Sequence, residues 1–199
     1  YSKRLRKFLT PILDVQKIKN NLGETLSKKK ITQLRIAETE KYAHVTYFFN
    51  GGNEDSFDYE DRVLIPSPRI DTYDKKPEMS ATELTNELIK RIKIKKYDFI
   101  VANYANPDMV GHSGNYRATV KAVETVDKCL GKIIEQCQKE NYLLVVTSDH
   151  GNADKMFDYE KDIPCTTHTI NKVPFIICEN IEFVKKIGKL ADIAPTVLK

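Results

Sequence analysis

Apolar residues along the chain gather in short continuous runs, which alternate with stretches where they recur every three or four positions. Such runs are typical of strands buried on both faces. We predict strands at residues 33–37, 45–49, 63–66, 98–104, 143–147 and 173–178. Because these strands alternate with amphipathic helices, we expect an α/β fold with a mainly parallel sheet and helices on both of its faces.

The periodic stretches predict the helices, and one of them has a recognisable start. Ser80 and Glu83 have the spacing of a capping box, in which each side chain bonds the other residue's backbone N–H. Leu84, Leu88 and Ile92 then follow at helical spacing. Further helices are predicted at residues 5–30 (interrupted at Pro11 and broken at 21–23), 118–140, 181–190 and 193–198.

The composition of the chain indicates a globular protein and argues against nucleic-acid and membrane partners. The 199 residues are 41% hydrophobic and 30% charged, which is ordinary for a soluble globular chain. The formal net charge of +4 comes without a basic stripe interleaved with aromatics, so we expect no nucleic-acid partner. No apolar run reaches the ~18–20 residues of a membrane span and no signal peptide is visible, so we expect no membrane partner and a cytoplasmic location.

The cysteines and the chain ends carry two smaller expectations. Cys129, Cys137, Cys165 and Cys178 form no C-x-x-C pair, so we expect free thiols. The chain starts at Tyr1 without Met and stops at Lys199 in mid-pattern, which indicates a fragment. The alternative is a processed natural chain.

The first candidate for chemistry is the segment 106–112, directly after a predicted strand. Pro107 and Gly111 disfavour a continuous helix, so we expect a loop from which Asp108 and His112 meet at one point. A carboxylate and an imidazole suit Mn²⁺ or Zn²⁺. The alternative is that Asp108 caps the next segment and His112 simply packs.

Asp149 and His150 also follow a predicted strand directly. Neighbouring side chains on an extended backbone point in opposite directions. These two therefore face one ion only if the chain is distorted there, and they bind more easily from a loop edge or between two ions. Gly151 permits a tight turn close to a ligand. The alternative is an Asx-turn at the strand end.

His168, just before the strand at 173–178, completes a pattern among the histidines. Three of the four histidines, His112, His150 and His168, fall at predicted sheet edges, and no cysteine has ligand spacing with them. A site of oxygen and nitrogen donors favours Mn²⁺, Mg²⁺ or Zn²⁺ in hydrolytic or phosphoryl-transfer chemistry over redox work. Of the four histidines, His44, which opens a predicted strand, has the weakest indication of a role in the site.

Lys41 lies in a charged segment between two predicted strands, again at a sheet edge. Its ammonium group could reach a substrate phosphate as a point charge. The alternative is a surface lysine paired with Glu38 or Glu40.

Several segments together resemble the cofactor-independent phosphoglycerate mutases, a family within the alkaline phosphatase superfamily. They lie in order along the chain at residues 37–52, 67–74, 77–81, 105–114, 148–153 and 167–169. The resemblance implies an alkaline-phosphatase-like fold. It also implies interconversion of 3-phosphoglycerate and 2-phosphoglycerate, a step of glycolysis and gluconeogenesis, through a phosphoserine. The family uses two Mn²⁺ ions (Mg²⁺, Co²⁺ or Zn²⁺ being possible) and no 2,3-bisphosphoglycerate.

The resemblance also implies roles for particular residues. The ligands of one ion would be Asp108, His112 and His168. Asp149 and His150 would be two ligands of the other ion. Lys41 would contact the transferring phosphoryl group.

Two parts of the family pattern have no match in this sequence. They are the segment with the nucleophilic serine and an aspartate ligand, and the inserted transferase domain. We therefore expect residues 1–199 to be the C-terminal part of the metal-binding phosphatase domain, with no catalytic nucleophile and no activity alone, and the intact enzyme to be a monomer. The alternatives are another enzyme of the superfamily, such as a phosphopentomutase, sulfatase or phosphodiesterase, and a non-catalytic metal-binding module.

Overall fold

A three-stranded parallel sheet forms the centre of the computed structural model, which describes residues 7, 8, 10, 18–181 and 187–199. β1 (Gln33–Glu38) lies in the middle, between β2 (Glu60–Ile65) and β3 (Phe99–Asn103). Both neighbours run parallel to β1, with Ile36 opposite Val63 on one side and Ala102 on the other. All six residues of β1 are buried, as expected for a central strand in such a sheet.

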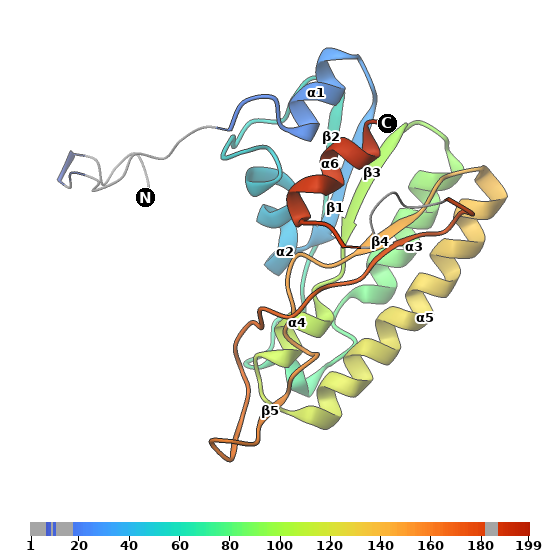
Figure 1. Ribbon diagram of the computed structural model, residues 1–199. Helices are drawn as coiled ribbons and strands as arrows, with labels where there is room; N and C mark the ends of the chain where they lie inside the picture. The colour runs from blue at the N-terminus through green and yellow to red at the C-terminus, as the bar shows by residue number, and fades with distance from the viewer. Residues whose placement is uncertain (1–6, 9, 11–17, 182–186) are drawn as a thin grey trace.

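Helices cover both faces of this sheet, which confirms the predicted fold class. In Figure 1 the strands lie between two sets of helices. On one side are α3 (Ala81–Lys93) and α5 (Tyr116–Glu140), and on the other are α1 (Leu22–Lys28) and α2 (Thr39–Ala43), which continues into a π-helical turn, η2 (His44–Phe48). Of the helix predicted at 5–30, the part at α1 is present, whereas residues 5, 6, 9 and 11–17 lie outside the described residues.

The two faces of β1 differ in character because successive side chains alternate between them. Leu34 and Ile36 are fully buried against an apolar cluster that includes Leu84, Leu88, Ile92 and Ile133. On the opposite face, Gln33 donates a hydrogen bond to the backbone oxygen of Gly23 at 3.0 Å. Arg35 there lies over the ring of Phe49 at 4.5 Å. The core is therefore apolar towards α3 and α5 and polar–aromatic towards α1.

The strand predicted at residues 45–49 is wrong, because this segment forms η2 and the residues just after it. Thr46 Oγ1 donates to the Tyr42 backbone oxygen at 2.7 Å, one helical turn earlier. Val45 and Thr46 are buried. A short apolar run has no periodicity of its own, so a strand and a buried helix segment look alike in sequence.

The helix predicted to start at Ser80 is present, but the predicted capping box is not formed. The Ser80 hydroxyl donates instead to the Pro66 backbone oxygen at 2.8 Å, and α3 has no side-chain cap from this residue. The hydroxyl thus ties the start of α3 to the segment after β2.

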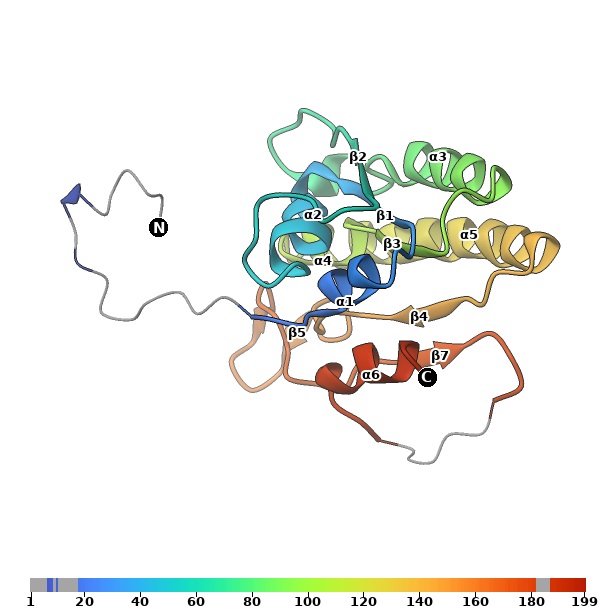
Figure 2. The same ribbon diagram turned by 90° about the horizontal axis from the view of Figure 1, so that it is seen from above.

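The remaining strands lie outside the parallel sheet. β4 (Val145–Thr147) pairs antiparallel with β7 (Phe175–Ile177) in a separate two-stranded sheet, which Figure 2 shows beside the central one. β5 (Phe157–Asp158) and β6 (Ile163–Pro164) form an antiparallel hairpin. The shorter helices are η3 (Tyr73–Lys75), α4 (Asn106–Gly111), η4 (Leu190–Asp192) and α6 (Ile193–Val197).

Three predictions concern the rest of the chain. Half of the helix predicted at 181–190, residues 182–186, lies outside the described residues; residues 181 and 187–189 are not helical, so the prediction is wrong there, and η4 begins only at Leu190. The four cysteines are free, as predicted. Among the described residues, no helix has both the length and the apolar character needed to cross a membrane.

Candidate metal centre

The predicted site residues gather where β1, β3 and β4 end and where the antiparallel β7 begins. Lys41 lies in α2 directly after β1, and Asp108 lies in α4 directly after β3. Asp149 and His150 follow β4, and His168 precedes β7. Ligands bind at this edge of open α/β sheets, because the loops that leave neighbouring strands meet there.

The segment of Asp108 and His112 is helical, so the prediction of a loop is wrong. α4 spans Asn106–Gly111, and Pro107 occupies its first turn, where the missing N–H has no intrahelical partner to lose. Asp108 and His112 lie four positions apart, which puts both side chains on one side of the helix. The helix therefore brings the two side chains together, as the loop was expected to do.

Three potential ligand atoms form a tight triangle beside α4. His112 Nε2 lies 3.1 Å from Asp108 Oδ1, His168 Nε2 lies 3.2 Å from the same oxygen, and the two Nε2 atoms are 3.2 Å apart. Ligands at about 2.0–2.2 Å from a shared divalent ion are separated from each other by roughly 3.0–3.5 Å. The spacing and the donor chemistry of these residues therefore fit such an ion.

The tautomer of His112 supports the same conclusion. Its Nδ1 lies 2.7 Å from the backbone oxygen of Thr166. A carbonyl oxygen only accepts, so Nδ1 carries the proton and Nε2 of the neutral ring keeps a free lone pair. Hydrogen bonds of this kind typically orient the histidine ligands of metals.

A second group of polar atoms surrounds the Lys41 ammonium, which lies 2.7 Å from Asp108 Oδ2 and 3.2 Å from Asp149 Oδ2. His150 Nε2 is 3.5 Å from Lys41 Nζ and 3.5 Å from Asp149 Oδ2. Lys41 is only 2% exposed, so the alternative of a surface lysine paired with Glu38 or Glu40 is wrong. Asp149 and His150 do face one point, through a bend in the chain after β4.

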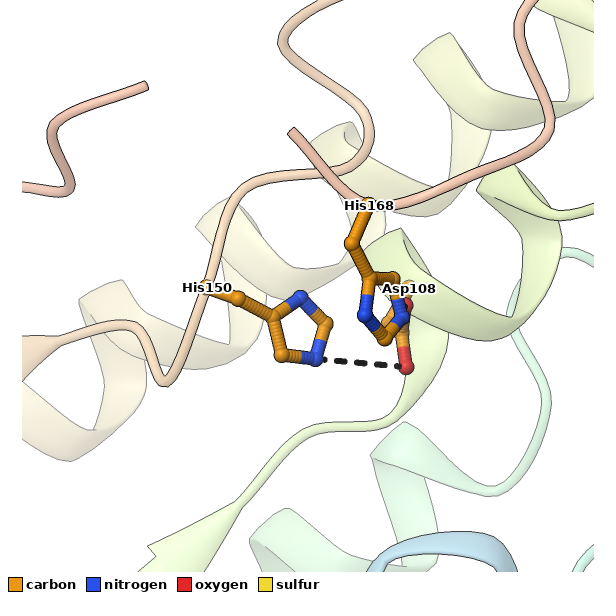
Figure 3. Close-up of side chains that lie close together, drawn as sticks. All are labelled: Asp108, His150 and His168. Atoms are coloured by element: carbon orange, nitrogen blue, oxygen red, sulfur yellow. Dashed lines mark ion pairs between the residues drawn. The ribbon is translucent and has the colours of Figure 1, made fainter. Parts of the chain in front are cut away.

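Asp108 joins the two groups, because each of its carboxylate oxygens faces a different one. Oδ1 faces His112 and His168, while Oδ2 faces Lys41 and lies 3.9 Å from His150 Nε2. Figure 3 shows Asp108, His150 and His168 converging, and the ligand atoms of these three all lie within 4.8 Å of one another. The two ligand sets expected from sequence thus lie side by side around one carboxylate.

The electrostatics of Asp108 follow from these neighbours. Burial acts to raise the pKa of its carboxyl, but hydrogen bonds from Lys41 and Asn152 outweigh burial and bring the pKa to about 2. Asp108 is therefore a carboxylate at neutral pH, as a metal ligand must be.

The fourth histidine lies at the margin of the site. His44 is exposed, and its ring packs against Phe48 at 5.4 Å between centroids. Partial burial, and then the positive charge of Lys41, lower the pKa of His44.

Sequence reasoning missed the residues that hold the two histidine loops together. Thr169 N donates to the Gly151 backbone oxygen at 2.9 Å, and Thr169 Oγ1 donates to the Asp154 carboxylate at 2.9 Å. Asp154 also accepts from the Asn171 amide at 2.5 Å. These bonds fix the loop of His168 against that of His150, and no sequence pattern marked Asp154 or Asn171.

Comparisons with known proteins add a family to this geometry. A family model described as Metalloenzyme superfamily matches residues 12–199. The 2,3-bisphosphoglycerate-independent phosphoglycerate mutase of Ehrlichia ruminantium (strain Gardel) is 56% identical over 185 residues, covering 92% of this chain and 37% of the relative. The protein of the same name from Gracilaria tenuistipitata var. liui is 56% identical over 199 residues, covering 95% of this chain and 39% of the relative. The chain thus spans less than two fifths of the length of these relatives.

A solved structure agrees with the expected fold. A structure of Leishmania mexicana phosphoglycerate mutase at low cobalt concentration superimposes with a TM-score of 0.73 and 33% sequence identity. The match covers 78% of this chain and 30% of that one.

Proposed function

The chain belongs to the Metalloenzyme superfamily, and from this membership we propose that the protein is a phosphoglycerate mutase that interconverts 3-phosphoglycerate and 2-phosphoglycerate through a phosphoserine, without 2,3-bisphosphoglycerate. The observation that carries the proposal is the Asp108 carboxylate, with one oxygen facing two histidines and the other facing Lys41. Phosphoryl transfer needs concentrated positive charge at one point, and these residues can hold it there.

We propose that the site holds two divalent ions. Mn²⁺ is the first candidate, and Mg²⁺, Co²⁺ or Zn²⁺ are the others. The ligands divide between the two ions as the resemblance implies. Asp108, His112 and His168 would hold one ion, and Asp149 and His150 would provide part of the second site. Bound ions of this class lower the pKa of a serine hydroxyl and offset negative charge on phosphoryl oxygens.

Lys41 has a distinct part in the proposal. Its ammonium group is fixed between Asp108 and Asp149 at the sheet edge, so it presents a positive charge at a defined point. A preorganised charge of this kind stabilises negative charge that develops on phosphoryl oxygens without reorganising during the reaction. We assign Lys41 to binding the transferring phosphoryl group.

The proposal places residues 1–199 in the C-terminal part of the phosphatase domain. The nucleophilic serine, a further aspartate ligand and the domain that holds the glycerate would belong to other parts of the protein. We propose a monomeric cytoplasmic enzyme with a small-molecule substrate, active in glycolysis and gluconeogenesis, whose residues 1–199 alone have no mutase activity.

The test is an enolase-coupled assay of the full-length protein with 3-phosphoglycerate and Mn²⁺, in the absence of 2,3-bisphosphoglycerate. We expect turnover that a chelator abolishes and that His168→Ala reduces at least about a thousandfold, as when a member of a catalytic unit is removed. Turnover only in the presence of 2,3-bisphosphoglycerate, or wild-type turnover in His168→Ala, would contradict the proposal. Hydrolysis of phosphate or sulfate esters without any mutase turnover would favour another enzyme of the superfamily.

A further inference from the structure

We propose that Asn152 is a positioning residue that fixes the orientation of the Asp108 carboxylate, so that Oδ1 is directed at the histidine pair and Oδ2 at Lys41. This inference rests on the proposed role of Asp108 as a metal ligand. It concerns a side chain that neither provides a ligand atom nor lies against the substrate in the proposed function.

Two hydrogen bonds run from the Asn152 amide to the same residue. Asn152 Nδ2 lies 2.8 Å from Asp108 Oδ1 and 3.2 Å from the Asp108 backbone oxygen. One amide group thus bonds both the side chain and the main chain of Asp108. Such a pair of bonds restricts rotation of the carboxylate about its own axis, because a rotation would break the bond to Oδ1.

The orientation of the Asn152 amide is set by its neighbours, because the Asp108 oxygens can only accept hydrogen bonds. If the amide were flipped, its oxygen would face the Asp108 carboxylate and backbone oxygens, which have no proton to donate. With the nitrogen facing Asp108, the amide oxygen is left buried, and it has no hydrogen-bond partner among the described residues. A buried acceptor without a partner destabilises the folded protein. The Asn152 side chain therefore leaves its own oxygen without a partner in the described part of the chain, while its N–H groups donate hydrogen bonds to Asp108.

Gly111 provides the space for this arrangement. Asn152 is 5% exposed and packs against α4 at Gly111. A Cβ at position 111 would lie 2.5 Å from Asn152 Oδ1 and 3.0 Å from its Cγ, distances at which the amide would have to move. The amide is part of a short, nearly buried side chain and cannot swing into solvent. Any side chain at 111 would thus displace the group that holds Asp108.

The orientation matters because the two oxygens of Asp108 have different partners. Oδ1 is 3.1 Å from His112 Nε2 and 3.2 Å from His168 Nε2, whereas Oδ2 is 2.7 Å from Lys41 Nζ. A carboxylate turned by some tens of degrees would open the histidine triangle and lengthen the Lys41 contact together. One amide thus affects both groups of the site.

The test measures Mn²⁺ binding to the full-length protein by calorimetry, next to thermal unfolding of the metal-free protein. Asn152→Ala and Gly111→Ala are each expected to raise the Mn²⁺ Kd about 10- to 100-fold, the range for residues that support metal ligands. The matched control is Asn115→Ala. The Asn115 side-chain oxygen caps α5 by accepting a 3.2 Å hydrogen bond from Ala118 N. Its loss should lower stability without removing a bond to Asp108.

The expected result is a raised Kd in the Asn152 and Gly111 variants and a wild-type Kd in Asn115→Ala. A wild-type Kd in Asn152→Ala, or an equal rise in Asn115→Ala, would overturn the inference. If Asn152→Ala does not fold, Asn152→Ser takes its place with the same criteria. Asp108→Asn separates the two proposals, because wild-type Mn²⁺ binding in that variant would refute the metal role of Asp108 itself.

Discussion

The ammonium group of Lys41 lies 2.7 Å from Asp108 Oδ2 in a part of the molecule where Lys41 is only 2% exposed. A lysine so deeply buried needs a negative partner, because an unpaired charge away from water costs several kcal/mol. Asp108 and Asp149 supply that partner from two other segments of the chain. The contact therefore links the helix after β1 to the helix after β3.

Replacing Lys41 with Met should destabilise the metal-free protein by about 2–4 kcal/mol, because it leaves two carboxylates close together without a cation. Urea unfolding measures the difference. The control is Lys75→Met, which removes an exposed ion pair of 2.8 Å with Asp71 and should change stability by less than about 1 kcal/mol. Equal losses of stability in the two variants would show that the buried ion pair contributes no more to folding than the exposed one.

Removing a histidine of the triangle should weaken metal binding strongly. His112→Ala and His168→Ala each delete one of three atoms spaced 3.1–3.2 Å apart, so the Mn²⁺ Kd should rise by more than the 10- to 100-fold typical of outer-shell changes. Calorimetric titration of the full-length protein tests this. His44→Ala is the matched control and should leave the Kd near the wild-type value. A similar rise in all three variants would contradict the assignment.

Glu38 should make stability depend on pH. Burial raises the pKa of its carboxyl from 4.5 to about 7, against hydrogen bonds from Ser80 and Ser67 that lower it. Between these two values the folded protein holds a proton that the unfolded chain has released, so the free energy of unfolding falls as pH rises through this window.

Glu38→Gln should remove that slope and stabilise the protein at pH 8 by up to about 3 kcal/mol. Urea unfolding at pH 5, 6, 7 and 8 measures both effects. Glu135→Gln, on the exposed side of α5, should leave the slope unchanged. A slope that persists in Glu38→Gln would mean that another group carries it.

Leu84 should be a major contributor to the core between α3 and the sheet. It is fully buried with Leu34 and Ile36 of β1, so Leu84→Ala should cost about 2–5 kcal/mol. Val123→Ala, at a position 46% exposed on α5, should cost less than about 0.5 kcal/mol. Thermal or urea unfolding distinguishes them, and comparable losses would place the core elsewhere.

Much of the fold could be predicted from the pattern of apolar and polar residues along the chain. The strands predicted at 33–37, 63–66 and 98–104 correspond to β1, β2 and β3, and the long amphipathic stretch at 118–140 corresponds to α5. The segment 45–49 was misassigned because a short, mainly apolar run fits a strand and a buried helical turn equally well.

Two further errors have different causes, one tertiary and one local. Ser80 does not close its capping box, because the Pro66 backbone oxygen comes within 2.8 Å of its hydroxyl. Residues 106–111 form a helix despite Pro107, because a proline in the first turn removes an N–H that has no partner there.

The sequence by itself determined which chemical groups stand at the ends of the strands. A side chain next to a predicted strand is placed by chain order alone, so Lys41, Asp108, Asp149 and His150, which follow predicted strands, and His168, which precedes one, could be named in advance. Only the tertiary structure decided that Asp108 turns one oxygen to the histidines and the other to Lys41, with Asn152 holding it there. The physical reason is that these contacts join residues from separate strand ends, and their distances depend on how the helices pack against the sheet.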